Sequence, residues 1–248
     1  MPNYKFIRFP FIKHILNYLQ AYSVGFFHLF YPHICMHCGN EELAAANVLC
    51  AACEKNLPYT HFLPIEKNSI EKIFWGRVSL HEAGASLFFT KDSIVQSLIF
   101  ALKYNNQKKA GRLLGNIIGK DILNSQRFKN IDCMIPIPLS KKKQRERGYN
   151  QALIICEGIQ EKIPHIQILP LVLKHKNAVS QTSKDRIQRT QLSSKSYSII
   201  DKGQIDKKNI LIVDDVITTG ATIESVCKYI LSEARPQSLS VVAAAYTI

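Results

Sequence analysis

Residues 211–222, with the sequence LIVDDVITTGAT, combine two adjacent carboxylates with a short loop of small and hydroxyl-bearing residues. The apolar run NILIV predicts a buried strand whose carboxyl end delivers Asp214 and Asp215. Ligands of open α/β sheets bind at that end of the strands, and adjacent strand residues point to opposite faces. We therefore expect the two acids to have different duties.

The residues after the acid pair are typical of a phosphate site. Small residues let backbone N–H groups approach an anion closely, and the amino terminus of a helix expected from about residue 222 adds partial positive charge. Hydroxyl donors and backbone freedom come from Thr218, Thr219, Thr222 and Gly220. A phosphate next to two carboxylates indicates a phosphorylated sugar whose vicinal hydroxyls donate to the acids. The alternatives are an exposed strand end and a nucleotide hydrolase, and the sequence lacks the Gly-x-x-x-x-Gly-Lys-Ser/Thr loop that a hydrolase of this kind needs.

Four of the seven cysteines form two Cys-x-x-Cys pairs separated by eleven residues. Each pair places two thiolates on one tight turn, and two such turns supply the tetrahedral sulfur shell that zinc prefers. Four sulfur ligands leave no open coordination position, so we expect a structural zinc site rather than a catalytic one, with a redox pair as the alternative. The predicted ligands are Cys35, Cys38, Cys50 and Cys53. The other cysteines are expected to be small buried apolar residues: Cys133, Cys156 and Cys227.

The chain of 248 residues is basic, with 32 Lys and Arg against 19 Asp and Glu, a formal net charge of +13 and a pI near 9.4. Its 46% of apolar residues is enough for a folded core. The excess positive charge favours polyanionic partners such as nucleic acid or highly phosphorylated ligands, although a generally basic surface would give the same total.

Residues 1–32 are apolar and aromatic but carry interspersed polar side chains, and no uninterrupted run reaches the roughly 18 residues of a membrane-spanning helix. No small-residue cleavage site follows an apolar core, so we expect a cytoplasmic protein that is not transmembrane. The segment predicts an apolar helix with two alternative placements. Either it lies on a membrane or a partner protein, or it packs on the rest of this molecule.

From residue 77 onward the pattern predicts strands that alternate with helices. Strands are expected over 77–90 with a break near Gly84, and over 131–138, 168–173, 209–213 and 239–248. Helices are expected over about 92–102, capped by Asp92, and over 113–122, 149–163 and 222–233. The segments 139–148 and 174–196 are expected to be basic loops. This order implies an α/β fold with a parallel sheet covered by helices on both faces. We expect an amino-terminal part, residues 1–65, with the apolar helix and the zinc module, and a main domain over residues 66–248.

Several of these segments resemble one known family. VDDVITTGAT resembles the signature of type I phosphoribosyltransferases, and within that superfamily the chain is similar to the ComF group, which is linked to DNA uptake in naturally competent bacteria. The likeness covers most of the chain: the cysteine pairs, LKY at 102–104, PIPLSKKKQRERGYNQA at 136–152, SQT at 180–182, and the arginines at 186 and 189. RERGYNQA separates this group from nucleotide-salvage relatives.

The resemblance implies a site for phosphoribosyl pyrophosphate, in which Asp214 and Asp215 hold the ribose hydroxyls together with a magnesium ion. It also implies that the following loop holds the 5-phosphate: Val216, Thr218, Thr219, Gly220, Ala221 and Thr222. Further anion contacts are implied for Lys103, for Arg145 and Arg147 in the pyrophosphate loop after Pro138, and for Gln181, Thr182, Arg186 and Arg189 in a mobile loop over 174–196. Leu192 stands where related sequences often carry Asn, so the polar role of that position is in doubt in this chain.

Two functions are compatible with these residues. In the first, a ComF-like competence protein binds phosphoribosyl pyrophosphate and acts on incoming single-stranded DNA during natural transformation, with a competence helicase or other DNA-uptake proteins as partners. Phosphate contacts would dominate strand binding, and Tyr104 and Tyr149 are available for stacking. In the second, an active phosphoribosyltransferase transfers ribose 5-phosphate to a base or amine in nucleotide metabolism. The intact acid pair favours the second function, but the sequence contains no acceptor signature.

Overall fold

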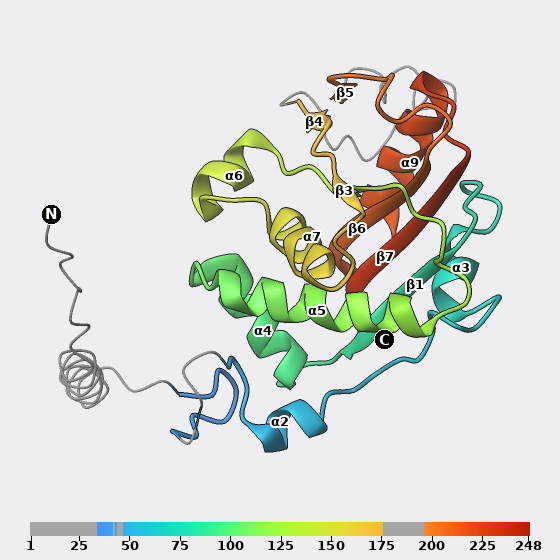
Figure 1. Ribbon diagram of the computed structural model, residues 1–248. Coiled ribbons are helices and arrows are strands. Elements are labelled where there is room, and N and C mark those ends of the chain that lie inside the picture. The colour runs from blue at the N-terminus through green and yellow to red at the C-terminus, as the bar shows by residue number, and fades with distance from the viewer. Residues whose placement is uncertain (1–33, 42, 44–46, 176–195) are drawn as a thin grey trace, which may run out of the picture.

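The computed structural model describes residues 34–41, 43, 47–175 and 196–248. Its centre is a five-stranded parallel sheet in the order β1-β7-β6-β2-β3 (Figure 1). Its strands are β1 (Ala83–Phe89), β2 (Cys133–Pro136), β3 (Gln167–Ile168), β6 (Asn209–Ile217) and β7 (Ser238–Thr247). A separate antiparallel pair consists of β4 (Val172–Lys174) and β5 (Tyr197–Ile199). The predicted parallel α/β sheet is confirmed, whereas the expected amino-terminal helix falls outside the described residues.

Helices cover both faces of the sheet, as Figure 1 shows. The helices of the described residues are α2 (Ala51–Lys55), α3 (Ser69–Phe74), α4 (Ile94–Tyr104), α5 (Lys108–Asn124), α6 (Lys141–Arg147), α7 (Gln151–Lys162) and α9 (Ala221–Glu233). Residues of α4, α5 and α7 join one core cluster, and residues of α3 and α9 join the other. Strand β6 contributes to both clusters, because Leu211 and Val213 belong to the first while Ile210 and Ile212 belong to the second. In the described part of the chain, no helix combines the length and the apolar character needed to cross a bilayer.

The direction of winding reverses between β2 and β6. The chain passes from β2 to β3 through α7 on one face of the sheet, and from β6 to β7 through α9 on the other. Pro136 at the end of β2 pairs with Val213, whereas β6 continues to Ile217. A reversal of this kind leaves a crevice at the carboxyl ends of the two strands, which is where open α/β sheets bind ligands.

Two glycines bring α5 and α7 into close contact. A Cβ atom on Gly115 would lie 2.1 Å from the carbonyl oxygen of Ile155, and one on Gly158 would lie 2.3 Å from the carbonyl oxygen of Arg112. Neither position accepts a side chain without separating the helices. The close approach of α5 and α7 fixes α7 against the helices on this face of the sheet. It also fixes the basic segment that precedes α7.

The structure corrects the prediction of a loop over 139–148, because α6 occupies most of that segment. The side chain of Ser140 caps α6 by accepting a hydrogen bond from the backbone N–H of Lys143, and Gly148 ends the helix in the left-handed region with φ of 78°. The predicted cap of α4 is also wrong. The side chain of Ser93, not that of Asp92, accepts the hydrogen bond from the backbone N–H of Gln96.

Two predicted strands have different limits in the structure. β1 begins only at Ala83 and runs through Gly84 without a break. The strand expected over 168–173 is divided between two sheets, since β3 ends at Ile168 and β4 begins at Val172. Pro170 lies between them and has no backbone N–H to donate to a ladder.

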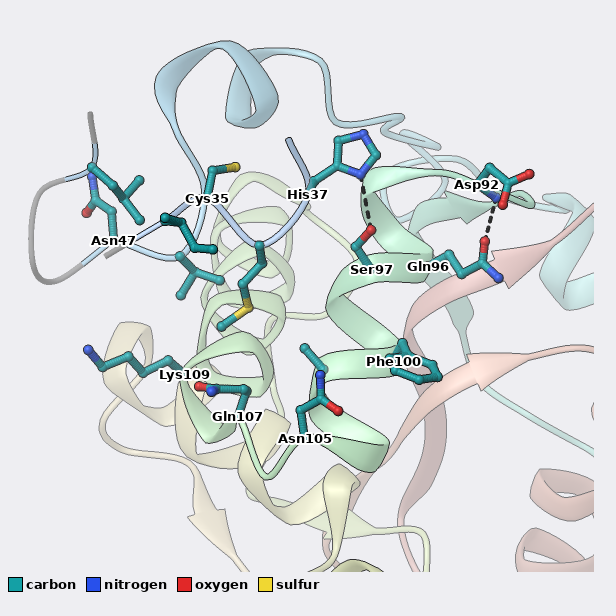
Figure 2. A pocket seen from close by; sticks show the side chains of 15 residues that line it. Cys35, His37, Asn47, Asp92, Gln96, Ser97, Phe100, Asn105, Gln107 and Lys109 are labelled. Carbon is teal, nitrogen blue, oxygen red and sulfur yellow. Dashed lines mark hydrogen bonds between the residues drawn. The ribbon is translucent and has the colours of Figure 1, made fainter. Parts of the chain in front are cut away.

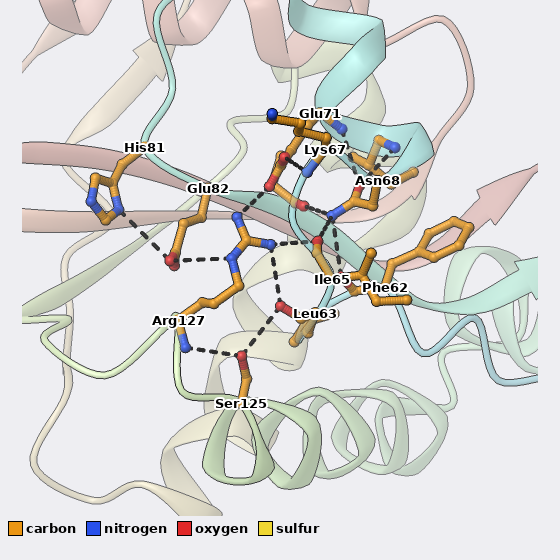
Figure 3. Close-up of polar contacts among 12 residues, drawn as sticks. Phe62, Leu63, Ile65, Lys67, Asn68, Glu71, His81, Glu82, Ser125 and Arg127 are labelled. Carbon is orange, nitrogen blue, oxygen red and sulfur yellow. Dashed lines mark hydrogen bonds and ion pairs between the residues drawn. The ribbon is translucent and has the colours of Figure 1, made fainter.

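A buried polar cluster around Arg127 fixes α3 beside the start of β1 (Figure 3). The guanidinium group pairs with Glu71 of α3 and, at 3.6 Å, with Glu82, and it donates to the backbone carbonyls of Ile65 and Leu63. The side chains of Arg127 and Glu82 are only 14% and 8% exposed. One guanidinium therefore connects α3, the segment before it and the first strand of the sheet.

Replacing Arg127 by methionine should destabilise the protein strongly. Arg127→Met leaves the carboxylates of Glu71 and Glu82 without their common positive partner, and we expect the free energy of unfolding to fall by about 3 kcal/mol or more. Urea denaturation followed by circular dichroism measures the loss. Arg112→Met is the matched control, because Arg112 is 52% exposed and its pairs with Glu157 and Glu161 should contribute about 1 kcal/mol or less. Equal losses in the two variants would contradict this account of the cluster.

Candidate functional sites

The acid pair occupies consecutive positions near the end of β6, and both side chains line one pocket. Asp215 lies on the side of α4, where its Oδ2 forms an ion pair of 2.9 Å with Nζ of Lys103. The side chain of Asp215 is only 13% exposed and that of Lys103 only 21%. Asp214 accepts a hydrogen bond of 2.8 Å at its Oδ1 from the backbone N–H of Asp215. One acid therefore has a cationic partner and the other does not pair with that lysine.

The environment of Asp214 favours its neutral form. Burial and the charge of Asp215 raise the pKa of Asp214 to about 8, although Lys103 and Lys143 act in the opposite direction. A cation or a strong hydrogen-bond donor close to the pair would favour the charged form instead.

A pocket of about 200 Å³ opens at the acid pair, at the reversal between β2 and β6. Six of the residues predicted from the sequence lie together in its lining: Asp214, Asp215, Val216, Thr222, Lys103 and Arg147. Five further polar residues, which are not among the predicted site residues, line it too: Ser140, Lys143, Lys174, Asn150 and Gln151. The motif RERGYNQA could have identified Asn150 and Gln151 as site residues. The placement of Lys143 in the pocket could be predicted only by knowing that its segment is helical.

Other predicted residues do not line this pocket. Thr218, Thr219 and Ala221 are exposed on the turn after β6, and Gly220 is buried within it. Arg145 lies on α6 and is exposed to solvent. The predicted contacts of the second basic segment lie outside the described residues, as does the departure at position 192: Gln181, Thr182, Arg186, Arg189 and Leu192.

The turn between β6 and α9 is supported from behind by α3 and the residues that follow it. Gly220 has φ of 71°, and a Cβ atom there would lie 2.9 Å from Cε1 of Phe74, so the position needs glycine for both its backbone angle and its contact. Arg77 donates to the carbonyl oxygen of Thr219 at 3.0 Å and pairs with Glu224 of α9. These contacts fix the backbone at the amino terminus of a 13-residue helix beside the acid pair.

The segment GYNQ connects α6 to α7 and orients Arg147. The hydroxyl of Tyr149 donates to the carbonyl oxygen of Leu102, next to Lys103 in α4. Asn150 caps α7 by accepting from the backbone N–H of Ala152 at 3.0 Å, and its amide donates to Ile137 at 2.9 Å.

Arg147 itself has two neighbours that set its direction. Its Nη1 donates to Oε1 of the buried Gln151 at 2.9 Å, and its guanidinium lies 5.8 Å from the ring centroid of Tyr104. The basic segment is thus fixed to α4 and α7 at the rim of the pocket.

The four predicted zinc ligands come together in the structure. The Sγ atoms of Cys35, Cys38, Cys50 and Cys53 all lie within 4.8 Å of one another, a spacing that fits one tetrahedral zinc ion with Zn–S bonds of about 2.3 Å. The backbone N–H of Cys50 donates to Sγ of Cys35 at 3.4 Å. Burial would raise the pKa of the Cys35 thiol, but the backbone N–H groups of Cys38, Cys50 and His37 outweigh it and lower the pKa to about 6. The donor set therefore suits a metal that binds thiolates.

The knuckles share a core with the main domain. Cys35, Leu49 and Cys50 belong to the same cluster of buried residues as Val95 and Leu98 of α4. His37 adds a hydrogen bond of 3.1 Å between its Nδ1 and Oγ of Ser97. The proposed division of the chain at residue 65 stays a prediction, and the metal module contacts the helix that carries Lys103.

Comparisons with known proteins agree with the resemblance noted in the sequence. Residues 166–247 match the family model of the phosphoribosyl transferase domain. Competence protein F of Haemophilus influenzae is 24% identical over 208 residues, which cover 80% of this chain and 91% of that protein. Competence protein ComFC of Bacillus subtilis is 32% identical over 107 residues, which cover 43% of this chain and 41% of that protein.

Solved structures of phosphoribosyltransferases resemble this fold at low overall similarity. The glutamine phosphoribosylpyrophosphate amidotransferase of B. subtilis, complexed with ADP and GMP, has a TM-score of 0.38 and 18% identity, over 54% of this chain and 26% of that one.

Loss of one cysteine ligand should remove the metal and destabilise the shared core. For Cys53→Ser we expect the zinc content, measured by plasma mass spectrometry, to fall from about one ion per chain to near zero. We also expect the Tm to drop by more than about 5 °C, since 1 kcal/mol corresponds to roughly 2–4 °C in a chain of this size. Cys227→Ala is the control, because Cys227 is a buried residue of α9 in the other core cluster and its replacement should leave the zinc content unchanged. Retention of zinc by Cys53→Ser would refute the assignment.

Proposed function

We propose that this chain, a member of the ComF family within the type I phosphoribosyltransferase superfamily, binds phosphoribosyl pyrophosphate with magnesium and acts on single-stranded DNA in the cytoplasm during natural transformation. The observation that carries the proposal is the meeting of Asp214 and Asp215 with Lys103, Arg147 and Thr222 in one pocket. A sugar that bears phosphates at both ends needs hydrogen-bond acceptors for its hydroxyls, and these must lie between two groups of donors that bind the phosphates.

The acid pair is assigned to the ribose and its metal ion. Carboxylates accept hydrogen bonds from vicinal hydroxyls and also bind magnesium, which prefers oxygen ligands. Because the pKa of Asp214 is raised to about 8, binding of the magnesium complex near neutral pH displaces a proton from that carboxyl. Asp215 already has a positive partner in Lys103, which the metal or the ribose hydroxyls replace.

The phosphates are assigned to the two ends of the pocket. The turn over 218–222 and the amino terminus of α9 receive the 5-phosphate through backbone N–H groups and the hydroxyl of Thr222. Arg147, Lys143 and the released Lys103 face the pyrophosphate. Arg145 and the residues Gln181, Arg186 and Arg189 keep the anion-binding roles that the family resemblance assigns to them.

Single-stranded DNA is assigned to the basic surface beside this pocket. Helix α6 carries Lys141, Lys142, Lys143, Arg145 and Arg147, and Tyr104 is 64% exposed next to it. Cations that follow a phosphate backbone, interleaved with aromatic rings that stack on bases, are the usual means of binding single strands. Curated relatives are named competence proteins, which supports a role in DNA uptake, with a competence helicase or other uptake proteins as partners.

An active phosphoribosyltransferase is the second candidate, and the preserved acid pair favours it. In that reaction the bond from ribose C1 to pyrophosphate breaks, positive charge develops at the sugar, and a base or amine nitrogen forms the new bond to C1. Lys103 and Arg147 would stabilise the departing pyrophosphate. Release of pyrophosphate that depends on an added acceptor base would identify this activity.

Binding of phosphoribosyl pyrophosphate should require the acid pair and should release a proton. With magnesium present, we expect calorimetry to detect binding to the native chain, and to detect none with the double variant Asp214→Asn/Asp215→Asn. Since the pKa of Asp214 is raised to about 8, affinity should increase as the pH rises from about 6 to 8, and the measured heat should depend on the ionisation enthalpy of the buffer.

Asp201→Asn is the control for this binding experiment, because Asp201 is an exposed residue bonded only within its own turn to Gly203 and Gln204. It should bind as the native chain does. Undiminished binding by the double variant would show that the site is wrongly assigned.

Binding of single-stranded DNA should be sensitive to salt. If about three phosphates are contacted, raising the salt concentration fourfold should weaken the affinity for an oligothymidylate by roughly twentyfold in a fluorescence anisotropy titration. Arg145→Gln should weaken binding and reduce the salt slope by about one contact, whereas Arg235→Gln, on the turn after α9, should change neither. An affinity that is the same at low and at physiological salt would contradict the DNA assignment. Competition between the oligonucleotide and phosphoribosyl pyrophosphate would place both ligands in one cleft.

A further inference from the structure

A groove of about 900 Å³ lies between the cysteine knuckles and α4 (Figure 2). Ile34 and Met36 form part of its knuckle wall, and Phe100 and Ala101 form part of its helix wall. Ile34 and Phe100 are large apolar residues that nevertheless remain 50% and 55% exposed. Large apolar side chains that gather at one hollow, instead of being scattered, mark a surface that another apolar group covers.

The two walls of the groove are fixed relative to each other. The hydrogen bond between His37 and Ser97 joins the knuckle to α4 at the rim (Figure 2). Met36 packs against the core cluster that contains α4 residues. An occupant therefore meets a preformed hollow, which lowers the ordering cost of binding.

The charge of the groove argues against a polyanion as its occupant. Among its described lining residues, Asp92 and Lys109 contribute one charge of each sign. This balance contrasts with α6, where lysines and arginines outnumber the acids. A nucleic-acid strand gains most of its affinity from cations, so the groove suits a neutral apolar segment better.

Such a segment lies next to the groove in the sequence. Residues 24–32, VGFFHLFYP, contain no Asp, Glu, Lys or Arg, and they include three phenylalanines and a leucine. Only His33 separates them from Ile34, which is itself part of the wall. Nine residues reach at most about 30 Å when extended, so this segment cannot lie far from the groove. A short tether also gives an effective concentration in the millimolar range, which exceeds that of an untethered competitor.

We propose that residues 24–32 of the same chain occupy the groove, with their phenylalanine and leucine side chains against Phe100, Met36 and Ile34. This contact covers the half-exposed apolar residues and joins the amino-terminal segment to α4 as well as to the knuckles. The sequence left two placements open for the amino-terminal segment. For the part nearest the cysteine knuckles, this proposal selects packing on its own molecule. Because α4 carries Lys103 in its last turn, the occupied groove also supports the helix that lines the pocket at the acid pair.

Photochemical cross-linking in the full-length, zinc-loaded chain tests this contact. Benzoylphenylalanine is placed at position 100, the chain is irradiated at low micromolar concentration, and the cross-linked peptides are mapped by mass spectrometry. We expect cross-links within single chains to residues 24–32, and the same target when the probe is placed at Gln96, which also lines the groove. A probe at Trp75, which is 56% exposed and lies outside the groove lining, should give none to that segment.

A charge substitution in the segment gives a second measure. Phe26→Asp with Phe30→Asp should reduce the yield of cross-links to residues 24–32 by about tenfold or more, because an unpaired carboxylate resists burial. Lys13→Asp with Lys5→Asp alters charge outside the segment and should leave the yield unchanged. Cross-links that form mainly between chains would assign the groove to a second copy and overturn the proposal. Cross-links from position 100 that avoid residues 24–32, or yields that do not respond to the two aspartates, would overturn it as well.

Discussion

Strand β6 is buried on both faces and contributes side chains to two apolar cores at once. The rest of the molecule is organised around this constraint. Its residues alternate between the core beneath α4, α5 and α7 and the core beneath α9 and α3. When the apolar run ends, Asp214 and Asp215 follow at once, and both line the pocket at the carboxyl end of the strand. The reversal of winding between β2 and β6 then opens a crevice beside them, since the neighbouring strand stops at Pro136.

Helix α4 joins the two halves of the described structure. One part of it contacts the cysteine knuckles through the shared core and through Ser97, and its last turn supplies Lys103 to the acid pair. Tyr149 donates to the carbonyl oxygen of Leu102 in that same turn, and this hydrogen bond positions the segment with Arg147 against α4. The cysteine knuckles are therefore in contact with the helix that lines the pocket, although the cysteines have no part in the proposed sugar-phosphate chemistry.

Sequence reasoning succeeded where one physical signal was strong. NILIV followed by two acids has a single sensible position in a parallel sheet, and two closely spaced cysteine pairs have few uses other than a metal. It failed where local capping outweighs composition. The segment KKKQRER lacks apolar periodicity and was assigned to a loop, yet Ser140 and Gly148 give it both helix caps. That helix turns Lys143 toward the pocket, and Lys174 arrives from β4, a strand displaced from the sheet to which its sequence was assigned. Neither placement can be inferred without the tertiary structure.

The ion pair between Lys103 and Asp215 means that the pocket supplies its own counter-charge. Two neighbouring carboxylates would otherwise repel a phosphorylated ligand before any contact formed. Because Lys103 pairs with Asp215, and Lys143, Lys174 and Arg147 also line the pocket, an approaching phosphorylated ligand would meet cations as well as carboxylates. In the proposed complex, binding would be an exchange of counterions: a metal or a pair of hydroxyls would take the place of the lysine, and the lysine would move to the phosphates. Selectivity would then come from ligands that carry both partners of the exchange in one molecule.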